Sequence, residues 1–400
     1  MTHPSHPTRL PVTAVTAVDT AARDAVVMSV QLDAPDAVVV RHDLSGAGSG
    51  VLRRVVSDAS GVVEDVTTPL DHACLSCALR EDLLPTLVRL ARDGRWSAAL
   101  LALPLASEPV PVVRGLLGGA VEGAPVGRWL DLAGVVCAVD TGALLHDVLG
   151  DDLLDERDLS HGDDDRSVGE VLARQLRGAD LVLAPGAAGR ERALLEHLAL
   201  PGVRAVVSQA CDTSGSTVLA RRHDARASAR WEDPRAVSPS GAEDADGVWT
   251  LDLADWRPVH PERLHENLER LASGHLVGRG RFWLPTRPDA VGVWDGAGGQ
   301  LSIGDAGPWQ LPGRDVSGTG GTGGTGGAAH AAVDRSTRLV VTGVDEDPER
   351  VRSAFAGSLL TDAELAAGLQ RWVGRADGFD AWLGEVVPHE REVPPADEAA

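Results

Sequence analysis

Three side chains that bind soft metal ions lie close together in the chain: His72, Cys74 and Cys77. Thiolates are the ligands that zinc prefers, and a two-residue spacer lets both sulfurs of a C-x-x-C pair reach one ion from a single turn. His72 could add a nitrogen, and three ligands suit an open or transferable zinc site better than a closed tetrahedral one. The pair could instead be a redox couple ahead of a helix, or two small buried residues at a strand–helix junction.

A fourth metal ligand would have to come from another part of the chain. Cys137, His146 and His161 are the candidates, and no spacing chooses among them. The acidic stretch at residues 151–165 could hold a harder cation. Runs of like charge are more often solvated loops, so we favour a solvated loop there.

The amino-terminal segment lacks the residues that bind a nucleoside triphosphate. An apolar run at residues 12–18, typical of a buried strand, is followed by Asp19-Thr-Ala-Ala-Arg-Asp-Ala25, which contains neither glycine nor lysine. A phosphate loop surrounds the phosphates with backbone N–H groups and uses a lysine to reach the outer oxygens. The whole chain has no lysine, because all 37 of its Lys and Arg residues are arginine. Arg23 could supply charge, but it cannot replace the glycines that let the backbone approach a phosphate.

Two other glycine-rich stretches do not compensate for this loss. Residues 46–50 have closely spaced glycines, but they lie between two strand-like runs at 38–44 and 51–56 and predict a hairpin turn. The glycine and threonine repeat at 318–327 has no flanking strand and helix, and we expect a flexible loop.

Charge and composition limit the partners of this protein. The 400 residues carry 59 acidic and 37 basic side chains, a net charge of −22, which opposes attraction to phosphate backbones. We therefore expect no direct nucleic-acid binding. Four cysteines are too few for a disulfide framework, and no apolar run reaches the length of a signal sequence or membrane span. The composition predicts a cytoplasmic protein with no membrane partner.

Strand-like and helix-like segments alternate in the first half of the chain. Further strands are expected at 37–41, 98–103, 132–139, 181–183 and 203–207, and helices at 81–92 and 168–176. Alternation of this kind predicts an α/β domain with a mostly parallel sheet.

The second half predicts a small α+β domain. Strands are expected at 248–253, 275–285, 290–295, 300–303 and 339–344, and helices at 261–272, 348–355 and 361–369. We divide the chain into a disordered start (1–9), the α/β domain (10–225), a linker (226–245), the α+β domain (246–385) and an acidic tail (386–400).

Several stretches together resemble the CobW-type family of GTP-binding metallochaperones. His72-Ala-Cys-Leu-Ser-Cys-Ala-Leu-Arg-Glu-Asp-Leu-Leu84 is similar to the family's Cys-x-Cys-Cys segment, which continues into Leu-Arg-x-Asp-Leu. Residues 163–180 resemble the helix that leads to the guanine-recognition strand, and 257–264, 280–289 and 359–365 resemble the signature of the CobW C-terminal domain. The resemblance covers residues 10–382 and implies a phosphate-loop-type α/β domain followed by that C-terminal domain.

The departures from the family pattern concern nucleotide binding. Besides the phosphate loop, Ala102 and Leu105 occupy the places of a glutamate and a glycine, and Leu181-Val-Leu continues into Ala184-Pro-Gly186 instead of the Asn-Lys-x-Asp motif. Ser76 replaces the middle cysteine of the metal segment. We therefore expect a pseudo-GTPase with a degenerate phosphate loop, for which GTP and magnesium are not cofactors.

The resemblance implies a function in zinc homeostasis. The best match is an actinobacterial subgroup with an altered phosphate loop, implicated in recruiting a ribosome hibernation factor when zinc is scarce. It implies a zinc-responsive adapter with a protein partner, such as the hibernation factor or the ribosome. The alternative is a divergent GTP-dependent zinc metallochaperone that uses arginine in place of lysine.

Overall fold

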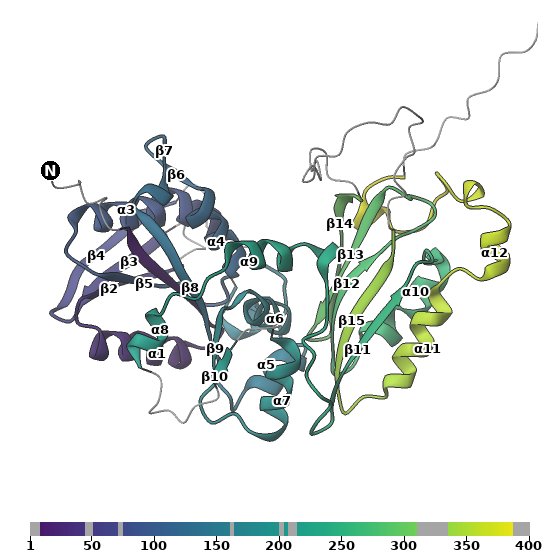
Figure 1. Ribbon diagram of the computed structural model, residues 1–400, viewed down its shortest axis with the longest axis horizontal. Coiled ribbons are helices and arrows are strands. Elements are labelled where there is room, and N and C mark those ends of the chain that lie inside the picture. Colours follow the sequence, from purple (N-terminus) through teal and green to yellow (C-terminus); the bar gives the residue numbers. More distant parts are fainter. Residues whose placement is uncertain are drawn as a thin grey trace, which may run out of the picture.

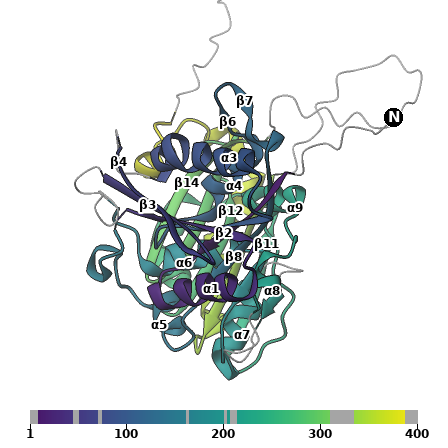
Figure 2. The same ribbon diagram turned by 90° about the vertical axis from the view of Figure 1, so that its left-hand side faces the viewer.

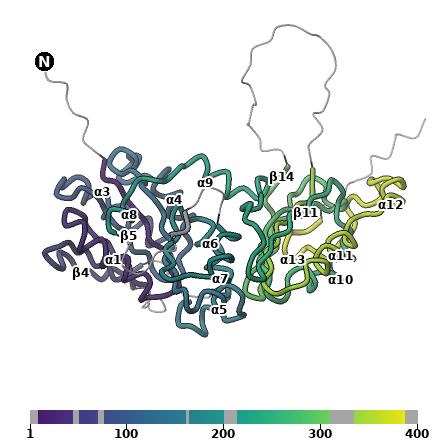
Figure 3. The backbone as a smooth tube through the Cα atoms, turned by 60° about the horizontal axis from the view of Figure 1, so that its bottom comes forward, coloured from purple at the N-terminus to yellow at the C-terminus, as the bar shows by residue number. Residues whose placement is uncertain are grey.

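The computed structural model describes residues 9–44, 51–70, 75–160, 164–199, 204–206, 214–309 and 335–386. Two domains follow one another along the long axis of the molecule, and helix α9 (Ala225–Glu232) runs between them (Figure 1, Figure 3). Residues 1–8 of the predicted start, the loop at 318–327 and residues 387–400 of the tail lie outside the described residues. Within the described ranges, no helix combines the length and the apolar character needed to cross a bilayer.

The amino-terminal domain is built on a sheet whose described strands run in the order β10-β9-β8-β1-β5-β2-β3-β4. The six strands from β10 to β2 are parallel, whereas β3 and β4 extend the sheet as an antiparallel hairpin. The predicted α/β class with a mostly parallel sheet is therefore confirmed. The bounds are β1 (Leu10–Thr16), β2 (Ala37–Asp43), β3 (Val51–Asp58), β4 (Gly61–Pro69), β5 (Ala98–Ala102), β8 (Leu130–Ala138), β9 (Leu181–Leu183) and β10 (Arg204–Val206), with a small separate hairpin of β6 (Ala120–Val121) and β7 (Ala124–Pro125).

Helices cover both faces of this sheet. Helices α1 (Thr20–Asp33) and α8 (Gly215–Leu219) lie on one face, and α3 (Leu84–Asp93) and α4 (Pro109–Gly118) lie on the other (Figure 2). Along β1, Val12 and Ala14 pack with α3 and α4, while Val15 packs with α1. A strand covered on both sides is apolar at nearly every position, which explains the mostly apolar run in the sequence; the buried exceptions are Thr13 and Thr16.

The C-terminal domain is a five-stranded antiparallel sheet in the order β11-β15-β12-β13-β14. Helices α10 (Pro261–Ala272) and α11 (Pro348–Ser358) cover its outer face (Figure 1). The strands are β11 (Val248–Asp255), β12 (Leu276–Phe282), β13 (Ala290–Ala297), β14 (Gln300–Pro308) and β15 (Thr337–Val344), and two short helices follow, α12 (Asp362–Ala366) and α13 (Asp380–Leu383). The predicted α+β arrangement is confirmed.

The inner face of the C-terminal sheet packs on the amino-terminal domain. Val277 and Val344 belong to the same buried cluster as side chains of α5 (Leu144–Leu149), α6 (Val168–Gly178) and α7 (Gly189–Leu198). The start of α6 is in close contact with the turn between β13 and β14, where a Cβ on Gly169 would lie 2.7 Å from the Cα of Gly298. Glycine at this position lets the two domains approach.

The boundaries differ from the predicted ones in a few places. The predicted linker at 226–245 is not structureless, because α9 begins at its start and is capped by the Asp224 side chain, which accepts from the N–H groups of Arg226 and Ala227. Helix α1 and strand β4 were not predicted, since neither has a marked periodic pattern: β4 is exposed along most of its length. The predicted helix at 81–92 corresponds to a π-helical turn (Leu79–Leu83) followed by α3, with Gly94 at its end in the left-handed region.

Candidate functional site

The connection between β1 and α1 is where a phosphate loop would lie. It consists of only three residues, Ala17, Val18 and Asp19, because β1 ends at Thr16 and α1 begins at Thr20. The Asp19 carboxylate accepts a hydrogen bond from the Ala22 N–H at 2.7 Å. A carboxylate therefore occupies the end of the helix, where the positive dipole and unpaired N–H groups would otherwise attract a phosphate.

Arg23, the one nearby candidate for the missing lysine, is turned into the protein. Its side chain is buried and donates to the Leu103 carbonyl oxygen at 3.1 Å and to Asp24 at 3.4 Å. Burial lowers the pKa of this guanidinium, and Arg41 adds to the effect, although the carboxylate of Asp24 opposes it. The Arg23 side chain thus holds the end of β5 against α1.

The segment after β5 closes the space beside this connection. The Ala106 N–H donates to the Ala17 carbonyl at 2.9 Å, and the Gln175 side chain donates to the carbonyls of both Ala17 and Ser107. Ala106 has φ of 58°, the left-handed conformation that favours glycine. The position whose backbone conformation favours glycine is therefore Ala106, one residue after Leu105, to which the family resemblance assigns the glycine.

The guanine-recognition position also lacks polar side chains. Strand β9 leads into Ala184, Pro185 and Gly186, and the Pro185 carbonyl accepts a hydrogen bond from the Thr141 hydroxyl. Ala184 is buried and offers no amide or carboxylate for a base. The residues of the β1–α1 connection, of the segment after β5 and of the segment after β9 therefore do not fit a magnesium-bound guanine nucleotide.

The predicted metal segment lies only partly within the described residues. Cys77 is buried in the short helix α2 (Leu75–Ala78), whereas His72, Cys74 and His161 lie outside the described residues. No group of three or more His, Cys, Asp or Glu side chains that could hold a metal ion occurs in the described part of the chain.

Two of the candidate fourth ligands, Cys137 and His146, make contacts of a different kind. Cys137 is fully buried on β8 and interacts with Thr16 on the neighbouring strand; burial raises the pKa of its thiol to about 12. Cys137 lies in the sheet interior and, among the described residues, belongs to no group of three or more side chains that could hold a metal ion. His146 lies exposed on α5, with Nε2 3.0 Å from an Asp152 carboxylate oxygen.

The acidic stretch at 151–165 binds arginines in its described part. Arg157 donates to Asp152 at 2.9 Å and to Asp147 at 3.1 Å, and Arg166 binds Asp164 at 2.7 Å. These carboxylates already have cationic partners, which agrees with the expectation of a loop rather than a cation site.

A buried polar cluster beside the metal segment was missed in the sequence. His42 at the end of β2 lies with Nε2 2.8 Å from the Asp82 carboxylate, and Arg54 of β3 also binds this carboxylate and donates to Thr86 at 2.8 Å. Burial opposes ionisation of Asp82, but the hydrogen bonds from His42 and Arg54 outweigh it and hold the pKa of this carboxyl below its usual range. The cluster joins two strands to the π-helical turn that follows Cys77. In the sequence, the only sign of this cluster is Asp82, a charged residue within the apolar helical pattern of residues 81–92.

A second polar cluster connects the two domains. Asp295 on β13 accepts hydrogen bonds from two arginines of α6, Arg174 at 2.9 Å and Arg177 at 2.7 Å. Arg174 also binds Glu108, which lies at the start of α4, at 2.9 Å. These ion pairs fix α6 between the amino-terminal sheet and the C-terminal sheet.

The fold and these segments define a class of protein: a two-domain protein with a mostly parallel α/β domain and an antiparallel C-terminal domain. Residues 248–359 match the family described as the cobalamin synthesis protein cobW C-terminal domain. A zinc chaperone of Mycobacterium tuberculosis is 30% identical over 325 residues, which cover 78% of each chain. The chain therefore belongs to the CobW family.

More distant relatives have related names. The zinc-regulated GTPase metalloprotein activator 1 of Dictyostelium discoideum is 23% identical over 340 residues, 77% of this chain and 69% of that protein. Among solved structures, the Zn(II)-bound YjiA GTPase of E. coli is 14% identical, with a TM-score of 0.33 over 88% of this chain and all of that chain.

Proposed function

We propose that this protein handles zinc without hydrolysing GTP, as a zinc-responsive adapter or metallochaperone-like factor of the cytoplasm. The observation that carries the proposal is the Asp19 carboxylate bound to the first turn of α1. A triphosphate placed there would meet a negative charge, no glycine-lined backbone and no lysine. The names of the zinc chaperone and the zinc-regulated activator support the zinc part of the proposal.

Zinc is the cargo in this proposal, and His72, Cys74 and Cys77 are the residues that would bind it. Two thiolates and one imidazole match the preference of Zn²⁺ for sulfur and nitrogen. Replacement of a third cysteine by Ser76 leaves one coordination position to water or to a ligand from a partner. Weaker, exchangeable binding suits a protein that responds to the zinc level.

Calorimetric titration with GTP and Mg²⁺ tests the nucleotide part. We expect no saturable binding by the wild-type protein. Arg23→Gln should lower stability, because the Leu103 carbonyl loses its donor, but should leave the titration unchanged. Saturable micromolar binding that Arg23→Gln abolishes would instead establish the GTP-dependent metallochaperone.

Competition with a chromophoric zinc chelator tests the metal part. The wild-type protein should withdraw one zinc ion from the chelator, and Cys74→Ser with Cys77→Ser should not. Cys211→Ser is the matched control, since it removes one thiol outside the C-x-x-C pair. Equal zinc stoichiometry in the wild type and the double variant would refute the assignment of the site.

We further propose that the partner is a protein, and that a ribosome hibernation factor is the first candidate. The net charge of −22 favours contact with a basic protein over contact with ribosomal RNA. Affinity capture from zinc-starved and zinc-replete actinobacterial cells, with the wild type and the Cys74→Ser/Cys77→Ser variant as baits, tests this. The factor should be captured by the wild type under starvation. Equal capture under both zinc conditions would contradict a zinc-responsive adapter.

A further inference from the structure

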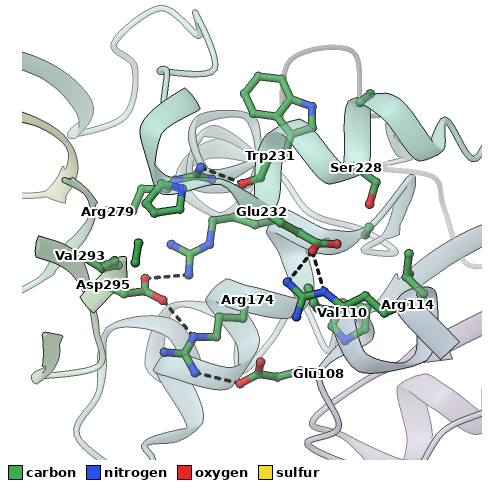
Figure 4. Close-up of a pocket in the computed structure, with 18 of the residues that line it drawn as sticks. Glu108, Val110, Arg114, Arg174, Ser228, Trp231, Glu232, Arg279, Val293 and Asp295 are labelled. Atoms are coloured by element: carbon green, nitrogen blue, oxygen red, sulfur yellow. Dashed lines mark hydrogen bonds and ion pairs between the residues drawn. The ribbon is translucent and has the colours of Figure 1, made fainter. Parts of the chain in front are cut away.

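A cavity of about 780 Å³ lies between the two domains. Helix α4 forms one side and α9 forms the upper rim, while β13 and the end of α6 close the other sides (Figure 4). Small-molecule sites commonly have volumes of about 300–1,000 Å³ and occur where domains meet. None of residues 17–23 lines the cavity, so it is separate from the position of the phosphate loop.

The cavity contains an arginine whose charge is poorly compensated. Arg174 and Arg177 bind Asp295, and Arg114 binds Glu232 at 3.0 Å. Among the described residues, Arg279 of β12 has no carboxylate partner, and the hydrogen bond found for it is to the Trp231 carbonyl at 3.2 Å.

The environment of Arg279 makes its positive charge unfavourable. Burial and, to a smaller extent, the neighbouring charge of Arg177 lower the pKa of its guanidinium to about 10, although Asp295 opposes this. A guanidinium has five N–H donors in a planar fork that matches a carboxylate or a phosphate. A bound anion would relieve the repulsion between the two arginines and use the remaining donors.

Alternation along β12 explains why Arg279 points into the cavity. Leu276 and Phe282 pack with α10 and α11, whereas Val277 contacts the amino-terminal domain. Arg279 lies on the same side as Val277, because residues two apart in a strand share a face. Arg281, two residues further, donates to the Arg235 carbonyl of the linker at 2.9 Å. The strand thus presents its arginines to the linker and to the cavity beside it.

The other walls of the cavity combine apolar side chains with further charged ones, Arg222, Asp180, Asp224 and Asp305. Pro109, Val110 and Val113 of α4 line one side, opposite Val293 of β13. Figure 4 shows Val110 on the right and Val293 on the left, with Arg279 near the rim formed by α9. An inorganic anion would leave this apolar surface uncovered, so the lining favours a ligand that also has an apolar body.

We propose that this interdomain cavity binds a small organic anion, with a carboxylate or phosphate group held by Arg279 and Arg177 and an apolar body packed against α4. Such a ligand would contact α4, α6, α9 and the C-terminal sheet at once, and binding would stabilise the present arrangement of the domains. The proposal depends neither on zinc nor on the absence of GTP binding.

Calorimetric titration with phenyl phosphate and benzoate tests the site. Inorganic phosphate has the charge without the apolar body, and benzyl alcohol has the ring without the charge. We expect saturable binding of phenyl phosphate or benzoate, at least tenfold tighter than that of either control. Tighter binding of phenyl phosphate would identify a phosphate ligand, and tighter binding of benzoate would identify a carboxylate.

Three variants locate the binding. Arg279→Gln should weaken the preferred probe at least tenfold. Ala227→Trp on α9 should have a similar effect, because it fills the cavity without changing charge. Arg352→Gln, on the exposed side of α11, removes the same charge away from the cavity and should not change affinity. Circular dichroism melting confirms that each variant is folded. The proposal is overturned if neither aromatic anion binds the wild type at millimolar concentration, or if Arg279→Gln binds as tightly as Arg352→Gln.

Discussion

Replacement of Asp295 by asparagine should weaken the connection between the two domains. The change keeps the shape of the side chain but removes the charge that two arginines of α6 share. Arg174 keeps Glu108 as a partner, whereas Arg177 loses the only carboxylate found for it among the described residues. Loss of one partner from a buried ion pair costs about 3–5 kcal/mol. Because the Asp295 side chain keeps 20% exposure, we expect the lower end, about 3 kcal/mol.

A second carboxylate of the C-terminal sheet provides a matched control for this loss of stability. Asp252 on β11 accepts two hydrogen bonds as well, but both come from Arg338, at 2.8 and 2.7 Å, and this pair lies at the surface with exposures of 36% and 30%. Exposed pairs contribute about 0–1 kcal/mol. Asp252→Asn should therefore cost less than about 1 kcal/mol in the same domain and with the same chemical change.

Urea unfolding followed by tryptophan fluorescence measures both costs. Seven of the ten tryptophans lie at or beyond Trp249, so the signal reports mainly on the C-terminal domain. If Asp295→Asn costs no more than Asp252→Asn, the ion pairs of α6 do not hold the domains together and our argument is wrong.

The difference in stability between the wild type and Asp295→Asn should depend on pH. Burial raises the pKa of Asp295, but attraction by Arg177 and Arg174 outweighs this and leaves the pKa below its usual value. The folded pKa is thus lower than the unfolded one. The advantage of the wild type over Asp295→Asn should be complete above about pH 4 and should fall as the pH drops through the folded pKa.

Three further predictions follow from individual contacts. Asp19→Ala should lower the free energy of unfolding by about 1 kcal/mol in urea titrations, because the Ala22 N–H loses its acceptor; an unchanged midpoint would contradict this. The hydrogen bond from Arg263 lowers the pKa of Glu364 to about 2 from 4.5, so its contribution to stability is complete above pH 4.5 and is lost as the pH falls through 2. Glu364→Gln should therefore flatten the decline in stability over this range by at most about 3 kcal/mol, and an acid titration identical to that of the wild type would refute the assignment. Cys137 should react with iodoacetamide at pH 8 only after unfolding, since burial raises the pKa of its thiol to about 12; mass spectrometry of the labelled native protein would reveal an exception.

Much of the fold could be predicted because its signals are local. The helix at Pro261–Ala272 and the strand at Leu181–Leu183 have the predicted bounds, since the period of apolar residues and the flanking residues are sufficient to define them. Helix α9 was missed within the predicted linker, because its polar surface and lack of buried side chains give little periodicity.

The sequence by itself determined which chemistry is available. A chain without lysine, with no glycine between Asp19 and Ala25 and with one C-x-x-C pair, lacks the groups of a phosphate loop and retains two soft metal ligands, whatever its conformation. These are statements about which atoms are present, and folding cannot add a missing amine.

Only the tertiary structure decided what the remaining charged groups do. Arg23 binds a carbonyl 80 residues away, His42 meets Asp82 across 40 residues, and Asp295 meets Arg174 across 121. Such partners are chosen by the order of strands in the sheet and by the packing of one domain on the other, and no local pattern encodes them. The interdomain cavity with Arg279 has the same origin, because its walls come from segments that become neighbours only when both domains have folded.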